Sequence, residues 1–246
     1  MASFVLVHGA WHGGWCWQRV AARLRAAGHE VCCPTLTGLG ERTHLLLPSI
    51  DLDTHIQDVV NVLAYEDLTG VVLVGHSYAG AVVTGVADRT VEQLIHLVYL
   101  DAFIPHDGEA LFDLHPPPMR EAMRARSDTE GEGWQLLPPP FSGAALFGIT
   151  DPADIAWVQR KLTPQPRAPH EQPLRLRCPA GSGLPRTFIY CANKAPGDPF
   201  AAMAQRVHEE AGWRYHELAT GHDAMITAPA ALTELLLEVV EPPPPM

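Results

Sequence analysis

The stretch VVLVGHSYAG (Val71–Gly80) decides the fold. Its four consecutive apolar residues, Val71–Val74, are typical of a strand that is buried on both faces, as in a parallel sheet. A sharp turn at Ser77 follows, and the small residues of Ala79–Ala87 predict a helix that packs closely against the sheet. A buried strand, a sharp turn and a helix in this order indicate an α/β protein.

Comparable apolar runs, bounded by turn residues, recur on both sides of this stretch, and apolar residues at helical spacing lie between them. A regular alternation of strands and helices predicts a doubly wound, mostly parallel sheet. The predicted strands are Phe4–Val7, Val71–Val74, His96–Leu100, Phe188–Cys191 and Arg214–Leu218, and the predicted helices include one with Trp17, Val20 and Leu24 before Gly28, one capped by Asp53 that carries Ile56, Val59, Val60 and Leu63, and one over Pro229–Val240.

Residues 105–185 interrupt this alternation with proline-rich runs, at His115–Pro118, Pro138–Pro140 and Thr163–Pro166. Proline lacks an amide hydrogen and cannot join a central sheet. A structureless loop of about 80 residues is uncommon in a compact domain, so we expect a cap of short helices over one edge of the sheet. The core then comprises residues 1–104 and 186–241, and the tail 242–246 is expected to fray.

Length and charge exclude several classes of protein. A chain of 246 residues fits one domain with a large insertion. The net charge of −11, without a basic cluster, argues against nucleic acid or an anionic membrane as a partner. No apolar run approaches a membrane helix, and the first residues, MASFVLVHGA, lack the basic region of a signal peptide. Five cysteines without a CxxC pair indicate reduced thiols rather than a zinc site, so we expect a cytoplasmic protein without a bound metal.

Ser77 is the predicted nucleophile. The turn departs from the pattern G-x-S-x-G in one place, because Ala79 stands at the second glycine position and Gly80 follows. The turn needs small residues two before and two after the serine, and alanine is small enough. Such a turn lifts the hydroxyl to the carboxyl edge of the sheet, where sites in open α/β folds lie. A serine that merely caps a helix is the structural alternative.

A serine hydroxyl needs a base to take its proton, and the chain offers 13 histidines. His222, in GHDAM after the last predicted strand, lies where an enzyme of this fold places its base. His76 adjoins Ser77, but neighbours on a sharp turn point in different directions. His8 ends the first strand and is expected to position a loop. The sequence therefore favours His222.

Two aspartates compete for the third position, which orients the histidine from the end of a strand. Asp101 directly follows the predicted strand His96–Leu100. Asp198 lies beyond the next strand, but Pro199 suits the first position of a helix through Val207, which makes Asp198 a natural N-cap. We favour Asp101, which has no such local role, and keep Asp198 as the alternative acid.

An oxyanion hole needs two backbone amides directed at the developing negative charge. The amide after the nucleophile, that of Tyr78, supplies one. The second is expected from the loop after the first strand, and we predict the amide of Ala10. Simple turn chemistry, with Trp15 and Trp17 in the core, is the alternative explanation of this loop.

With these residues in place, the chain resembles the α/β-hydrolase superfamily, and within it the branch of plant methylesterases, hydroxynitrile lyases and related bacterial carboxylesterases. The resemblance covers nearly the whole chain and implies a Ser–His–acid triad, a helical cap over an apolar pocket, and no cofactor. The motifs that carry it are HGAWHGGWCW (His8–Trp17), PTLTGLGER (Pro34–Arg42), GHSYAG (Gly75–Gly80), YLDAFIP (Tyr99–Pro105), FIYC (Phe188–Cys191) and GHDAM (Gly221–Met225).

The chain departs from this family pattern in two places. The plant members carry their acid three residues after the cysteine of the FIYC-like strand, where this chain has Lys194, and a small apolar residue where it has Asp101. An acid on the previous strand, a known alternative in the superfamily, fits Asp101, and an insertion that brings Asp198 into place stays open. The lyases have a threonine and a lysine where this chain has Gly9 and Asp223, so cyanohydrin cleavage is not expected.

Three functions follow from these residues. The favoured one is a serine hydrolase of small, largely apolar carboxylic esters that works through an acyl-enzyme. The second is a lyase, cyclase or carbon–carbon-cleaving enzyme acting on a natural product with the same scaffold. The third is a small-molecule binder without catalysis, against which the intact Ser77 and His222 argue. The expected partner is a small ester, and a homodimer is compatible with the sequence.

Overall fold

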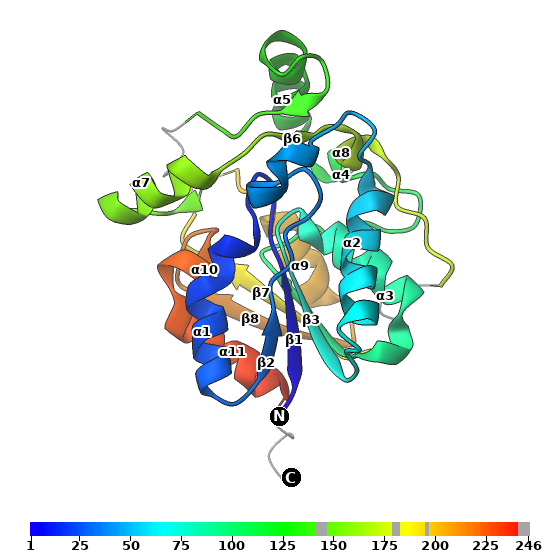
Figure 1. Ribbon diagram of the computed structural model, residues 1–246, viewed down its shortest axis with the longest axis vertical. Coiled ribbons are helices and arrows are strands. Elements are labelled where there is room, and N and C mark those ends of the chain that lie inside the picture. The colour runs from blue at the N-terminus through cyan, green and yellow to red at the C-terminus, as the bar shows by residue number, and fades with distance from the viewer. Residues whose placement is uncertain (141–146, 179–182, 195–196, 241–246) are drawn as a thin grey trace.

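The computed structural model describes residues 1–140, 147–178, 183–194 and 197–240. Its centre is a six-stranded parallel sheet in the order β2-β1-β3-β4-β7-β8, which confirms the predicted doubly wound α/β fold (Figure 1). The strands of this sheet are β1 (Ser3–Val7), β2 (Glu30–Cys32), β3 (Val71–His76), β4 (Leu94–Leu100), β7 (Arg186–Cys191) and β8 (Trp213–Leu218).

Helices cover both faces of the sheet, so alternate residues of a strand enter different cores. On β1, Val5 and Val7 pack with α2, α3 and α9, whereas Phe4 and Leu6 pack with α1, α10 and α11. In Figure 1, α1 and α11 lie on one side of the sheet and α2 and α3 on the other. The core helices are α1 (Gln18–Ala26), α2 (Leu52–Tyr65), α3 (Ala79–Arg89), α9 (Ala201–Glu209), α10 (Ala224–Thr227) and α11 (Pro229–Val240), with short 3-10 turns η1 (Gly14–Trp17), η2 (Gly40–Leu45) and η3 (Val91–Gln93).

Two predicted helix starts are wrong by a few residues. The cap of α2 is Asp51 rather than Asp53: its carboxylate accepts the amide of Thr54 at 2.9 Å, and the Thr54 hydroxyl accepts the Asp51 amide in return. The helix after β7 begins at Ala201 rather than at Pro199.

The segment between β4 and β7 lies above the carboxyl edge of the sheet, at the top of Figure 1. It contains a short antiparallel pair, β5 with β6, in addition to the short helices that the sequence predicts. The domain boundaries at 105 and 185 stay a prediction, and the tail 242–246 lies outside the described residues. The elements of the segment are α4 (Leu111–Leu114), α5 (Pro117–Glu130), β5 (Gln135–Leu136), α7 (Pro152–Lys161), β6 (Gln165–Pro166) and α8 (Ala168–Glu171).

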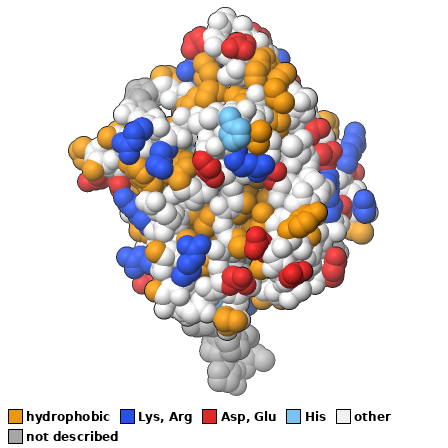
Figure 2. Space-filling view, in the orientation of Figure 1, with side chains coloured by type: hydrophobic (Ala, Val, Ile, Leu, Met, Phe, Trp, Pro, Cys, Tyr) orange, Lys and Arg blue, Asp and Glu red, His pale blue; other side chains and the backbone are white. Residues whose placement is uncertain are grey.

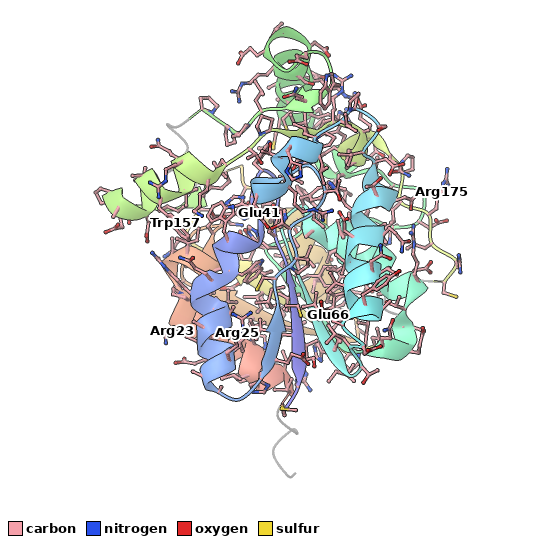
Figure 3. The ribbon with its side chains drawn as sticks, in the orientation of Figure 1. Arg23, Arg25, Glu41, Glu66, Trp157 and Arg175 are labelled. Carbon is pink, nitrogen blue, oxygen red and sulfur yellow. The ribbon has the colours of Figure 1, made fainter. Side chains whose placement is uncertain are left out.

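Charged side chains spread over the outside of the core, as Arg23 and Arg25 on α1 and Glu66 after α2 illustrate in Figure 3. On the face shown in Figure 2, hydrophobic side chains gather at the top, over the segment between β4 and β7. Across the described ranges, none of the helices has the length and apolar character needed to cross a membrane.

Candidate active site

The order of the strands determines where a site can form. After β1 the chain adds β2 on one side of it. The next strand, β3, pairs with the other side of β1, and β4 is added beyond β3, so the direction of winding reverses between β1 and β3. In open α/β sheets, the crevice at the carboxyl end of such a reversal is the usual place for a ligand. The loop after β1 carries Ala10 and the turn after β3 carries Ser77, so the two predicted elements meet at this point.

Ser77 occupies a strained turn between β3 and α3. Its φ is +57°, in the left-handed region that non-glycine residues rarely adopt. The turn is fixed on both sides: the Ser77 amide donates to the carbonyl of Leu100 at 3.1 Å, and its carbonyl accepts the amides of Gly80 and Phe103 at 3.1 and 3.2 Å. Bonds to the end of β4 therefore hold the strained conformation.

The structure explains why a glycine follows Ala79. A Cβ on Gly80 would lie 2.0 Å from the carbonyl oxygen of Phe103, so α3 can approach the chain after β4 only with glycine at this position. Ala79 is buried, and its methyl group fits where the common pattern has glycine. Compared with the pattern G-x-S-x-G, the second glycine stands one residue later in this chain, and the sharp turn is still formed.

His222 and Asp101 come together although 121 residues separate them. The Nδ1 of His222 lies 2.5 Å from Oδ2 of Asp101, and both side chains are buried. Asp101 follows β4 with a φ of +44°, and its Oδ1 accepts the amide of Cys191 at 3.2 Å. Asp101 thus lies where the sequence places an orienting carboxylate, and its own conformation is fixed by the neighbouring strand β7.

Asp198 lies on the same side of the site but contacts other groups. Its Oδ2 accepts the hydroxyl of Tyr190 at 3.0 Å, and its Oδ1 accepts the amide of Phe200 at 3.2 Å. Lys194 joins the two candidate acids: its Nζ lies 2.6 and 2.7 Å from the oxygens of Asp101 and 2.7 Å from Oδ2 of Asp198. Asp198 therefore reaches the histidine only through Lys194 and Asp101.

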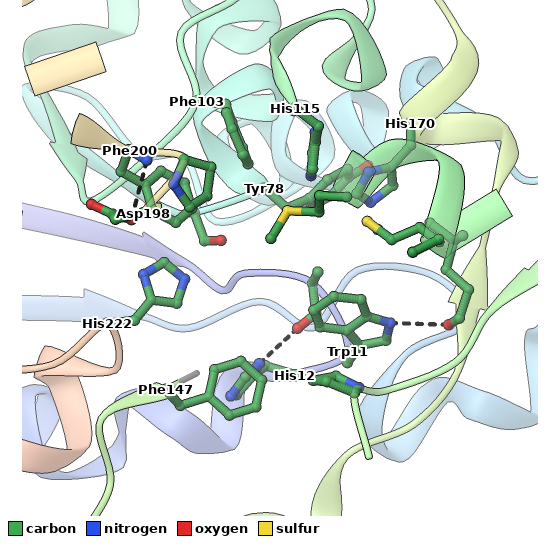
Figure 4. Close-up of a pocket in the computed structure, with 18 of the residues that line it drawn as sticks. Trp11, His12, Tyr78, Phe103, His115, Phe147, His170, Asp198, Phe200 and His222 are labelled. Carbon is green, nitrogen blue, oxygen red and sulfur yellow. Dashed lines mark hydrogen bonds between the residues drawn. The ribbon is translucent and has the colours of Figure 1, made fainter. Parts of the chain in front are cut away.

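Ala10 and Tyr78, the two predicted oxyanion donors, both line the cavity next to Ser77. Within the described part of the chain, neither backbone amide donates to another residue. The loop that carries Ala10 is held from behind, because Nδ1 of His12 donates to the Ala10 carbonyl at 2.7 Å (Figure 4). Two amides at this edge are thus available for a ligand.

Hydrogen bonds tie the side chain of Tyr78 to helix α2. Its hydroxyl lies 2.7 Å from Nδ1 of His55 on α2, whose Nε2 lies 2.9 Å from the carbonyl oxygen of Thr37. Burial lowers the pKa of His55 and raises that of Tyr78, so both groups are neutral around pH 7. A neutral chain of hydrogen bonds therefore fixes the position of Tyr78.

A second histidine–aspartate pair, absent from the sequence predictions, joins the loop after β1 to the loop after β8. Nε2 of His12 lies 3.1 Å from Oδ2 of Asp223, and both side chains are buried. Burial alone would lower the pKa of His12, but Asp223 raises it above the ordinary value. The two nitrogens of His12 face two acceptors, the Ala10 carbonyl and Asp223, which fits an imidazolium paired with a carboxylate.

His76 has a supporting role rather than that of a base. Its Nε2 lies 3.0 Å from the backbone carbonyl of His222, and burial, together with the nearby His222, lowers its pKa well below the ordinary value. Donor atoms of His76, His222 and Asp223 lie within 4.8 Å of one another. Nε2 of His76 bonds to the His222 carbonyl, Nδ1 of His222 to Asp101, and Oδ2 of Asp223 to His12, and these three bonds hold the loop after β8 in place.

His8 packs as the sequence predicts, with Nδ1 on the Gly9 carbonyl at 2.8 Å and Nε2 accepting the amide of Leu36 at 3.0 Å. Burial lowers its pKa to about 3.

Ser77 and His222 open into one cavity of about 560 Å³, shown in Figure 4. In this view His222 and Phe147 lie toward one end, His115 and His170 lie toward the other, and Trp11 borders the space between them. Most of the wall is apolar or aromatic, with contributions from Trp11, Phe103, Met119, Ala122, Met123, Leu136, Leu137, Pro139, Pro140, Phe147 and Phe200.

A serine on a sharp turn after a parallel strand, with a histidine–aspartate pair at the same sheet edge, is typical of α/β hydrolases. A family model described as "Alpha/beta hydrolase family" matches residues 4–235. The chain therefore belongs to the alpha/beta hydrolase family, as the sequence predicts.

Among known proteins, the chain is similar to a "Carbendazim hydrolyzing esterase" of Nocardioides sp. (strain SG-4G), at 42% identity over 96% of this chain and 98% of that protein. Methylesterase 10 of Arabidopsis thaliana is 28% identical over 96% of this chain and 90% of its own length. Two solved structures share the fold. An extracellular α/β-hydrolase from a Paenibacillus species has a TM-score of 0.84 and 23% identity, covering 97% and 99% of the two chains. A methylesterase from Arabidopsis has a TM-score of 0.78 and 26% identity, covering 98% and 99%.

Proposed function

We propose that this protein is a carboxylesterase-type serine hydrolase, with Ser77 as nucleophile, His222 as base and Asp101 as the orienting acid. The observation that carries this assignment is the 2.5 Å contact between His222 Nδ1 and the buried Asp101 Oδ2, because His222 lines the same cavity as the strained Ser77. The relatives, named as esterases, support the same class of reaction.

In the proposed reaction, each of these groups has one role. His222 takes the proton of the Ser77 hydroxyl, whose oxygen attacks the ester carbonyl. The amides of Ala10 and Tyr78 stabilise the oxyanion, and loss of one such donor typically lowers the rate about 10²–10³-fold. His222 then protonates the departing alcohol, and water releases the acid from the acyl-enzyme by the reverse route.

The cavity favours a neutral, apolar substrate. The charged groups on its wall are compensated: Lys194 binds two carboxylates, and Arg126 donates to Glu130 and to the carbonyl of Pro138. Aromatic and aliphatic side chains form most of the remaining surface. Since several relatives are named as methylesterases, we propose esters of apolar acids with a small alcohol, the acid part filling the cavity.

The assignment is tested with p-nitrophenyl butyrate and with methyl esters of aromatic acids. We expect turnover by the natural protein, loss of it in Ser77→Ala, and covalent labelling by a fluorophosphonate probe that the same substitution abolishes. Ser49→Ala, which removes an exposed hydroxyl, is the matched control and should keep both properties.

The lyase or cyclase hypothesis makes the opposite prediction. It requires conversion of a substrate without ester hydrolysis, and wild-type protein inert toward all esters offered would favour it over the esterase.

A further inference from the structure

Lys194 stands where related plant enzymes are expected to carry their catalytic acid, yet it is part of the site. It is nine-tenths buried, with 8% of its side chain exposed. Its three ammonium hydrogens match three carboxylate oxygens at 2.6 to 2.7 Å, two on Asp101 and one on Asp198. The rings of Tyr190 and Phe200 flank the same nitrogen, with centroids 4.4 and 4.9 Å away.

The geometry points to an ionic network of Asp101, Lys194 and Asp198 that sets how strongly the protein stabilises the His222 imidazolium, with Lys194 and Asp198 as positioning residues. This inference rests on the proposed roles of His222 and Asp101. Two carboxylates and one ammonium leave one net negative charge beside the imidazole. That charge balances the imidazolium, which forms when Ser77 loses its proton.

The other groups packed around His222 do not disturb this balance. Its ring lies against His76, with centroids 4.4 Å apart, and burial keeps the pKa of His76 well below the ordinary value. Burial also raises the pKa of the Cys191 thiol, so that group is neutral. His12 and Asp223 form a pair whose charges compensate each other.

Asp198 faces one more titratable group, the hydroxyl of Tyr190, which donates to it at 3.0 Å. Burial and the neighbouring Asp198 raise the pKa of Tyr190, so this hydroxyl keeps its proton. Phe200 stacks on His222 at 4.7 Å between centroids and also flanks Lys194. The groups around the network are thus neutral or, in the pair of His12 and Asp223, compensate each other's charge, so a change of one formal charge acts directly on the histidine.

The test uses the pH dependence of kcat/KM, in which activity falls on the acid side as His222 becomes protonated. We call the pH range of this fall the acid limb. Lys194→Met leaves two negative charges near the imidazole, so the midpoint of the acid limb is expected to rise by about one pH unit. Asp198→Asn, nearly isosteric, leaves no net charge and is expected to move it downward by about the same amount. The double variant restores one negative charge, so its acid limb should return toward that of the natural protein.

Two controls separate this effect from general damage. Lys161 is the only other lysine, and Lys161→Met on α7 removes the same charge away from the site. Asp67→Asn removes an exposed carboxylate in the loop before β3, at the other end of the sheet. Neither should move the acid limb. A purely structural role for Lys194 would lower kcat or stability without opposite displacements of the limb.

A spectroscopic measurement separates this inference from the proposed function. The downfield proton of the bond between His222 Nδ1 and Asp101 can be followed by NMR through a pH titration, without any substrate. Opposite displacements of its midpoint in Lys194→Met and Asp198→Asn would support the network even if no ester is hydrolysed. Midpoints that move in one direction, or not at all, in folded variants would overturn it.

Discussion

Gly148 and Gly221 face each other so closely that a Cβ on either would lie 2.4 Å from the Cα of the other. Gly221 precedes His222, and Gly148 belongs to the segment above the sheet. The amide of Asp223 also donates to the carbonyl of Phe147 at 3.0 Å. The segment between β4 and β7 thus limits where the loop with the proposed base can lie.

Gly221→Ala should therefore displace His222. We expect kcat for ester hydrolysis to fall at least about tenfold, since a misplacement of 1 Å can cost about 100-fold. Gly28→Ala is the control: it is also strained, with a φ of +87°, but has no atoms within 4 Å of the added methyl group. That variant should lose stability, about 1 kcal/mol, and keep its kcat. Equal kcat values for the two variants would disprove the coupling.

The two candidate acids should differ sharply in steady-state kinetics. Asp101→Asn removes the negative partner of His222 while keeping the shape of the side chain, and we expect kcat to fall about 10⁴-fold. Asp198 reaches the histidine through Lys194 and Asp101, so the kcat of Asp198→Asn should fall far less. A larger loss in Asp198→Asn would make Asp198 the acid.

The pair of His12 and Asp223 should contribute to stability. Asp223→Asn leaves a buried imidazole without its charged partner, and we expect the free energy of unfolding at pH 6 to fall by about 3 kcal/mol. Because folding raises the pKa of His12, this stabilisation is full below pH 6.5 and is lost as the pH rises through the folded-state pKa. Urea titrations at several pH values measure both effects, and an unchanged unfolding midpoint at pH 6 would refute the pairing.

Buried neutral histidines should make the fold sensitive to mild acid. Burial lowers the pKa of six of them below 6.5, that of His96 to about 4. The unfolded chain binds more protons below pH 6.5, so the stability falls as the pH falls, by up to about 1.4 kcal/mol per pH unit for each histidine. The six are His8, His55, His76, His96, His115 and His170.

Denaturant unfolding between pH 6.5 and pH 4.5 tests this expectation. In His96→Gln the new side chain can still reach the Thr187 hydroxyl. The slope of the unfolding free energy against pH should then decrease by the amount that corresponds to the uptake of about one proton. His44→Gln, at an exposed position, should leave the slope unchanged. A stability that stays constant down to pH 4.5 would contradict the proposal.

Much of the sheet could be predicted because its strands are buried on both faces and form uninterrupted apolar runs. Each of the five predicted strands is observed, extended by up to two residues. Strand β2 was missed, since Glu30–Cys32 has only three residues, begins with a charged one and pairs at the sheet edge. Asp51 and Asp53 are both suitable cap residues, and the reciprocal bonds of Asp51 with Thr54 place the start of α2 at the earlier one.

In the proposed site, too, only the residues with a local sequence signal could be predicted. The turn at Ser77 is a local pattern, and the proposal of His222 rests on its place after a strand. The network around Lys194 could not, since its bond to Asp101 joins residues 93 apart, in the loops that follow two different strands. The pairing of His12 with Asp223 spans 211 residues and likewise leaves no local signal.

The residues that line the cavity come from two different parts of the chain. Ser77 and His222 lie in loops that follow strands of the core, whereas Met119, Met123 and several other lining residues come from the interval 105–185. A single contiguous stretch of coding sequence therefore carries much of the wall of this cavity. Under the proposed function, recombination or insertion within that stretch can change which ester is accepted while Ser77 and His222 are inherited intact.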